Sequence, residues 1–136
     1  MKARAFLDTN VLIYAVAENE PRAARAEELL LSGGVVSVQI LNEFTAVARR
    51  KLVMPWAEVA EAVGAFLVLC PSPVSITLET HMAARAIAEK LGCNIYDALV
   101  VATALEAGCD TIYSEDFQDG QRIEGKLTVR NPFGKP

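Results

Sequence analysis

The sequence has a single histidine and three cysteines among its 136 residues. His81 lies beside apolar Met82 and has no nucleophilic partner, so the chain holds no Ser-His-Asp pattern. Cys70, Cys93 and Cys109 are odd in number, lie far apart and form no CxxC pair. This spacing argues against a disulfide framework or a zinc site and predicts buried or free thiols in a reducing compartment.

The sequence also has no long apolar run, no glycine-rich phosphate loop and no excess of positive charge. No segment approaches the ~18 apolar residues that cross a bilayer. Asp8 and Asn10 interrupt the apolar start of the chain early, which excludes a signal peptide. The net charge of -4 argues against a nonspecific basic nucleic-acid binder. We expect a cytoplasmic protein without a membrane segment.

What is present predicts a folded protein, since 52% of the residues are hydrophobic and 22% are charged. We expect residues 1–136 to form one domain. The expected strands are the run ending before Asp8, 35–38, 74–76, 111–113 and 127–130. The expected helices are 11–17, 22–31, 39–52, 56–69, 77–91 and 94–107. In the second helix, we expect the leucines at 29–31 to face the core and Arg22 to be solvated.

Strands separated by helices favour parallel pairing with right-handed crossover connections. The helix at 94–107 is apolar on nearly every side, which indicates a central, buried position. The predicted fold class is therefore α/β. It is a single α/β/α domain with a central, mostly parallel sheet flanked by helices.

Asp8 ends the first expected strand, and an apolar helical run begins directly after Asn10. Open α/β sheets bind their ligands at the carboxyl ends of the strands. Aspartate is also a favoured residue at the start of a helix, where its side chain caps backbone N–H groups. Asp8 is therefore either a helix cap or the first member of a metal-binding cluster of acids.

Two further acids lie on inward helix faces. Glu43 falls on the apolar stripe between Ile40 and Val47, where a carboxylate needs a cation or hydrogen-bond donors. An arginine partner or a position at the protein rim is the alternative for Glu43. Asp97 lies in the first turn of the most apolar helix, and with Asn94 it also matches a capping arrangement.

Asp116 follows the expected strand 111–113 by three residues. Glu115 and Asp119 lie in the same turn, and acids in such turns are commonly solvated. If the four acids converge, their like charges raise one another's pKa. Mg²⁺ or Mn²⁺ bound through oxygen ligands compensates that repulsion. Such ions acidify water and stabilise charge on a phosphate, which is nuclease chemistry.

Four motifs occur in order along the chain. They are LDTNVL at 7–12, LNEF at 41–44, IYDALVVATA at 95–104 and YSEDFQDG at 113–120. Together they resemble the PIN-domain ribonucleases, and more narrowly the VapC-type toxins of toxin–antitoxin modules. The resemblance covers almost the whole chain, including the Asn-Pro-Phe at 131–133.

The resemblance implies a cytoplasmic, Mg²⁺- or Mn²⁺-dependent endoribonuclease that cuts RNA such as tRNA or rRNA and so inhibits translation. It implies a homodimer and a cognate antitoxin protein. The catalytic, metal-binding acids that it implies are Asp8, Glu43, Asp97 and Asp116. The supporting polar residues that it implies are Thr9, Asn10 and Ser114, with Asp119 as a second acid of the last motif.

Two other functions remain compatible with this sequence. Some phosphohydrolases place an Asp-x-Asp pair after the first strand, but Asn10 stands where the second Asp belongs, which removes their general acid. A catalytically silent module could instead use the same acids to hold metal or a basic peptide. Separately, the helix at 56–69 repeats apolar residues with few charges, which predicts one face on its own domain and another on a second subunit.

Overall fold

The computed structural model describes residues 4–134. Four strands in this part of the chain form a sheet in the order β1-β2-β4-β3. The strands are β1 (Ala5–Leu7), β2 (Thr111–Tyr113), β3 (Arg122–Ile123) and β4 (Leu127–Arg130). The β1–β2 and β2–β4 pairs are parallel, and only β3 runs antiparallel to β4. The predicted mostly parallel sheet is confirmed, whereas β3, at two residues, is too short to show a periodicity in the sequence.

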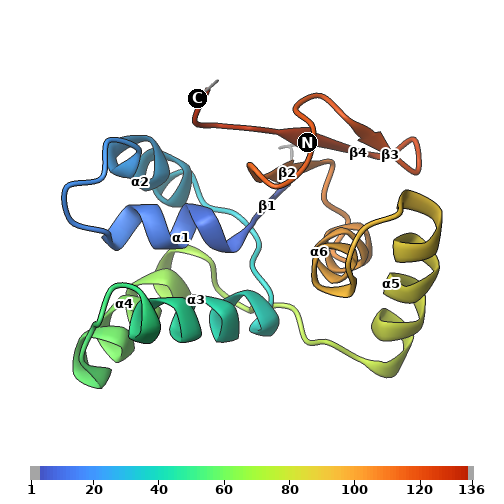
Figure 1. Ribbon diagram of the computed structural model, residues 1–136. Coiled ribbons are helices and arrows are strands. Elements are labelled where there is room, and N and C mark those ends of the chain that lie inside the picture. The colour runs from blue at the N-terminus through green and yellow to red at the C-terminus, as the bar shows by residue number, and fades with distance from the viewer. Residues whose placement is uncertain (1–3, 135–136) are drawn as a thin grey trace.

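Six helices lie in the described part of the chain (Figure 1). They are α1 (Thr9–Val16), α2 (Ala23–Leu31), α3 (Val38–Arg50), α4 (Trp56–Leu69), α5 (Leu78–Leu91) and α6 (Ile95–Glu106). Helices α1 to α4 form one group, and α5 packs with α6 beside them (Figure 1). No helix within residues 4–134 has both the length and the apolar character needed to cross a bilayer.

The patterns at 35–38 and 74–76 predict strands, but the structure forms only isolated parallel bridges there. One bridge joins the first segment to β1, and the other joins the two segments to each other. Ser37 explains the early end of the first segment, because its side chain accepts the backbone N–H of Ile40 and caps α3. Because α3 begins directly at Val38, the extended segment cannot continue past Ser37, which itself bridges to Val74.

The prediction that all three leucines at 29–31 of α2 face the core is wrong. Leu29 and Leu30 are buried, but Leu31 is 73% exposed. Consecutive residues lie about 100° apart around a helix, so three in a row cannot all face one core. Helix α6 agrees with its prediction, since the run 100–104 is buried around the whole helix.

The register of the sheet determines where the strand ends meet. Phe6 pairs with Ile112 and Ile112 pairs with Val129, and all three side chains are fully buried on one face. Leu7 pairs with Tyr113 at the carboxyl ends of β1 and β2. The residues that follow these two strands therefore lie side by side at one edge of the sheet.

Candidate functional site

Asp8 lies at that edge and is only 3% exposed. Its Oδ1 accepts the backbone N–H of Thr9 at 2.7 Å, so Asp8 caps α1, which begins two residues earlier than predicted. Its Oδ2 accepts a hydrogen bond of 2.6 Å from the hydroxyl of Ser114, the residue that follows β2. Asp8 thus caps a helix and also joins the two strand ends.

The charge of Asp8 is poorly compensated. Burial raises the pKa of its carboxyl from the ordinary 3.8 to about 7, even though the hydrogen bonds from Ser114 and Thr9 lower the pKa. The charges of Asp116 and Glu43 raise the pKa further. Within residues 4–134, no lysine or arginine forms an ion pair with Asp8.

Asp116 is held beside Asp8 by the same serine. The Ser114 hydroxyl oxygen accepts the backbone N–H of Asp116 at 3.0 Å. Partial desolvation raises the pKa of the Asp116 carboxyl, the charge of Asp97 raises it further, and a hydrogen bond with Asp8 lowers it. The other charges that raise this pKa are those of Glu115 and Glu43. Asp116 therefore interacts with each of the other three acids predicted as ligands.

Glu43 and Asp97 are half-buried and each is oriented by a polar neighbour. The Thr9 hydroxyl donates to Glu43 Oε2 at 2.8 Å. The Asn94 side chain accepts the backbone N–H of Asp97 at 2.9 Å and donates to Asp97 Oδ2 at 3.0 Å. The predicted cap of α6 by Asn94 is confirmed. The carboxylate of Asp97 still contributes negative charge near Asp116.

Two of the predicted supporting residues lie in different surroundings, since the amide oxygen of Asn10 is buried and Asp119 is exposed. Asn10 Oδ1 is buried and has no hydrogen-bond partner within the described residues, so a water or a bound group is needed to satisfy it. Asp119 is exposed, and its Oδ1 accepts the backbone N–H of Asn131. Asp119 is bonded instead to the segment after β4, and it is not among the charges that shift the pKa of Asp8 or Asp116.

The four acids are suitable ligands for a hard divalent cation, since all of them offer carboxylate oxygens and none has its charge compensated by an ion pair with another described residue. Within residues 4–134, however, no three Asp, Glu, His or Cys side chains lie close enough to hold an ion as they stand. The Ser114 hydroxyl joins Asp8 to Asp116, and a three-acid site requires Glu43 or Asp97 to approach this pair. The site is therefore preformed in part.

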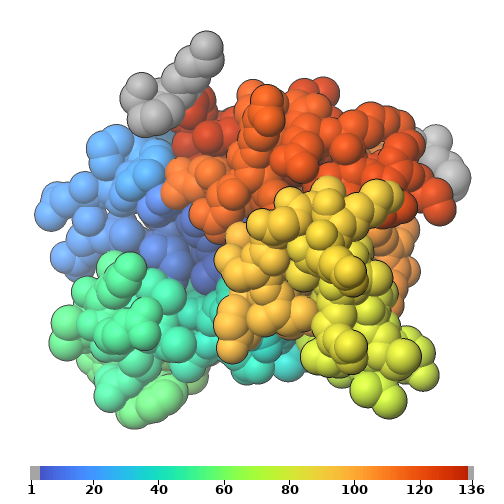
Figure 2. Space-filling model, turned by 45° about the vertical axis from the view of Figure 1, so that its right-hand side comes forward, coloured from blue at the N-terminus to red at the C-terminus, as the bar shows by residue number. Residues whose placement is uncertain are grey.

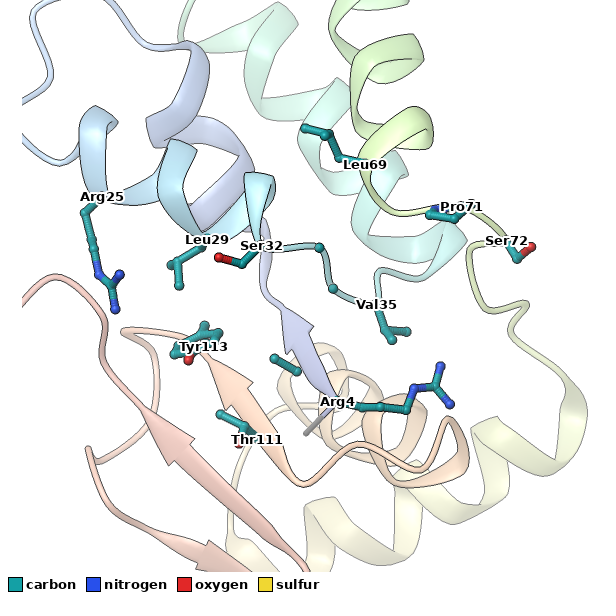
Figure 3. Close-up of a pocket in the computed structure, with 13 residues that line it drawn as sticks. Arg4, Arg25, Leu29, Ser32, Val35, Leu69, Pro71, Ser72, Thr111 and Tyr113 are labelled. Carbon is teal, nitrogen blue, oxygen red and sulfur yellow. The ribbon is translucent and has the colours of Figure 1, made fainter. Parts of the chain in front are cut away.

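The segments that carry the acids surround a recess on the face shown in Figure 2, where the blue start of the chain lies deep between the teal, gold and orange segments. A separate hollow of about 700 Å³ lies beside β1, β2 and α2. Figure 3 shows Arg4 and Arg25 at opposite ends of that hollow, with Leu29 and Tyr113 between them. None of the four acids lines it.

The PIN domain family model matches residues 5–121, which include all four acids. The chain belongs to the PIN-domain family. A search of curated proteins found no match to this sequence.

Two solved structures share the fold of this PIN domain. The VapC20 toxin of Mycobacterium tuberculosis, which cleaves the sarcin-ricin loop, is 19% identical, with a TM-score of 0.66 over 82% of this chain and 89% of that one. VapBC2 of Rickettsia felis, solved bound to a DNA fragment from its promoter, is 19% identical, with a TM-score of 0.65 over 93% of this chain and 96% of that one.

Sequence reasoning missed a polar network beside the acids of this PIN domain. Arg22, predicted to be solvated, forms two contacts of 2.7 and 2.8 Å with Glu20. These contacts lower the pKa of Glu20 to about 2. Arg22 also lies over the ring of Tyr14, 3.8 Å from its centroid, and Tyr14 donates to Glu115. The signal in the sequence was weak, because a tyrosine in an apolar helix indicates only packing.

Replacing Asp8 with Asn tests whether the negative charge of this buried carboxylate destabilises the folded protein. The raised pKa means that the folded protein binds the proton more tightly, so its stability falls as pH rises from about 4 to about 7. Asn keeps the helix cap without the charge. In metal-free protein, we expect Asp8→Asn to raise the free energy of unfolding at pH 8 by about 1 kcal/mol or more, and to change it little at pH 4.

Urea unfolding at the two pH values, with EDTA present, measures this difference. Asp110→Asn is the matched control, since Asp110 is exposed and precedes β2, at the opposite end of that strand from Ser114 and Asp116. A destabilised Asp8→Asn variant at pH 8 would show that the charge is well compensated in the folded protein.

Proposed function

We propose that this PIN domain is a metal-dependent endoribonuclease that acts in the cytoplasm as the toxin of a toxin–antitoxin pair. The proposal depends mainly on one observation, the buried Asp8, which shares a serine with Asp116 and senses the charge of Glu43. Membership of the PIN-domain family supports nuclease chemistry at these acids. The fold shared with VapC20, a toxin that cleaves the sarcin-ricin loop, supports RNA as the substrate.

Each polar residue of the edge has a role in this proposal. The acids that would hold a Mg²⁺ or Mn²⁺ ion are Asp8, Glu43, Asp97 and Asp116. A divalent ion in such a setting lowers the pKa of water and stabilises negative charge on a phosphodiester. Ser114 orients Asp8 and Asp116 through its two hydrogen bonds, and Thr9 orients Glu43. The buried amide oxygen of Asn10, which has no hydrogen-bond partner within the described residues, is free to accept from a bound water.

The net charge of -4 fits this proposal, because the acids concentrate negative charge at the site itself. Such a site attracts the phosphate of RNA through the cation that it binds. Selection among RNAs then depends on loop shape and unstacked bases read by the surrounding surface.

The proposal includes two protein partners, a cognate antitoxin and a second copy of this chain. Helix α4 offers a surface for the second copy, since its exposed residues include Trp56 at 63%, Leu67 at 38% and Val68 at 79%. Its only charged residues are Glu58 and Glu61. Exposed apolar side chains gathered on one helix are typical of a surface that another protein covers.

The first test is RNA cleavage by purified protein. We expect cleavage in Mn²⁺ or Mg²⁺, none in EDTA, and a loss of at least about 100-fold in Asp8→Asn and Asp97→Asn, because each removes a charged ligand of the ion. The assay follows cleavage of structured RNAs by gel electrophoresis.

Asp110→Asn serves as the control for charge and for contaminating nuclease, and it should cleave like the wild type. Full activity of both ligand variants would overturn the mechanism. Metal binding by the wild type without cleavage would indicate a silent binding module instead.

The second test is the oligomeric state. Val68→Lys places a charge on the exposed face of α4, so we expect a dimeric wild type and a monomeric variant, because an unpaired charge in an apolar interface is costly. Size-exclusion chromatography with light scattering measures both masses. Val53→Lys is the control, since Val53 is 75% exposed but lies outside α4. A monomeric wild type would contradict the proposed dimer.

A further inference from the structure

The loop that carries Asp116 is fixed at three points. At its start, the Ser114 hydroxyl accepts the Asp116 N–H and donates to Asp8. Near its end, Asp119 accepts the N–H of Asn131. Between them, Glu115 is bound by side chains of α1 and of the residue before α2, and this contact has no role in the proposed chemistry.

Tyr14 and Arg22 together hold Glu115. The Tyr14 hydroxyl donates to Glu115 Oε1, and Arg22 Nη1 lies 3.6 Å from Glu115 Oε2. The same Arg22 nitrogen donates to the Tyr14 hydroxyl at 2.8 Å. The phenol thus accepts from the arginine and donates to the glutamate, and each hydrogen bond polarises the next.

The two holding side chains are themselves fixed. Glu20 accepts from Arg22 through both carboxylate oxygens and also accepts its backbone N–H at 2.8 Å. Phe133 packs edge-on against the Tyr14 ring, with 5.0 Å between centroids. A charge-assisted, two-point contact and an aromatic contact restrict both rotamers, so the pair acts as a rigid support.

This support lies next to the acids. Arg22, Glu115 and Asp116 line the same hollow of about 310 Å³. The charge of Glu115 acts directly on Asp116, its neighbour in the loop. A released Glu115 could turn toward the acids and displace Asp116 from its place beside Asp8.

We propose that Tyr14 and Arg22 are positioning residues, which hold Glu115 toward the helices and thereby keep Asp116 beside Asp8. The proposal rests on the proposed function, because it assigns the support a role in placing one ligand of the nuclease. Arg22 is unsuited to binding a phosphate itself, since Glu20 and Glu115 already surround its charge. The support acts on the reaction only through Asp116.

The test uses Tyr14→Phe, which removes one hydroxyl and keeps the ring on Phe133, and Arg22→Gln. We expect amide hydrogen exchange of Asp116, whose N–H is bonded to Ser114, to accelerate about five- to ten-fold in both variants when measured by NMR. We expect kcat for RNA cleavage to fall about ten-fold with KM nearly unchanged, because Asp116 acts at the reacting phosphate and not in general RNA contact.

The controls are Tyr113→Phe and Arg85→Gln. Within the described residues, the Tyr113 hydroxyl and the Arg85 guanidinium form no hydrogen bond or ion pair, and neither side chain lies near Glu115 in the hollow of Asp116. Both controls should match the wild type. In a Glu115→Ala background, Tyr14→Phe should have no further effect on exchange or kcat, since the group that it holds is gone.

Unchanged exchange in both variants, or a full additional effect in the Glu115→Ala background, would overturn the proposal. Accelerated exchange with unchanged kcat would also overturn it, because the loop would then move without consequence for the reaction. A wild type that does not cleave RNA would overturn the proposed function, and the exchange rates alone would then decide whether Tyr14 and Arg22 hold the loop.

Discussion

The hydrogen bond between Ser114 and Asp8 is the contact on which the site depends. It exists because Leu7 pairs with Tyr113, so the residues after β1 and β2 emerge side by side. A shift of one residue in this register would turn each side chain to the other face of the sheet. The buried pairing of Phe6 with Ile112 opposes such a shift, so the hydrophobic core sets the geometry of a polar site.

The site is costly to the fold in the absence of a cation. Asp8 is almost fully buried, and the nearby carboxylates of Asp116 and Glu43 repel its charge. Hydrogen bonds from Ser114 and Thr9 offset only part of this cost, as the raised pKa of Asp8 indicates. An arrangement that disfavours its own charge but supplies oxygen ligands favours the binding of a divalent ion, and this is the physical basis of the proposed nuclease.

Much of the fold follows from the sequence, because long helices have strong periodic signals. The bounds of α4, β2 and β4 agree with their predicted ranges. The errors have local causes, such as the cap at Ser37 and the exposure of Leu31. The four acids were predictable as charges in apolar or strand-end positions. The contact of Arg22 with Tyr14 and Glu115 was not, because it joins three separate segments and leaves no periodic pattern.

The most direct test of the proposed metal site is a structure of crystals soaked with Mn²⁺, in which anomalous scattering at the manganese absorption edge locates the ion. We expect a manganese peak roughly 2–2.5 Å from carboxylate oxygens of Asp8 and Asp116 and of at least one of Glu43 and Asp97. Side chains of Glu43 or Asp97 turned inward would accompany it. Well-ordered crystals with no manganese peak beside Asp8 and Asp116, whether the ion is bound elsewhere or nowhere, would contradict a metal site at these acids.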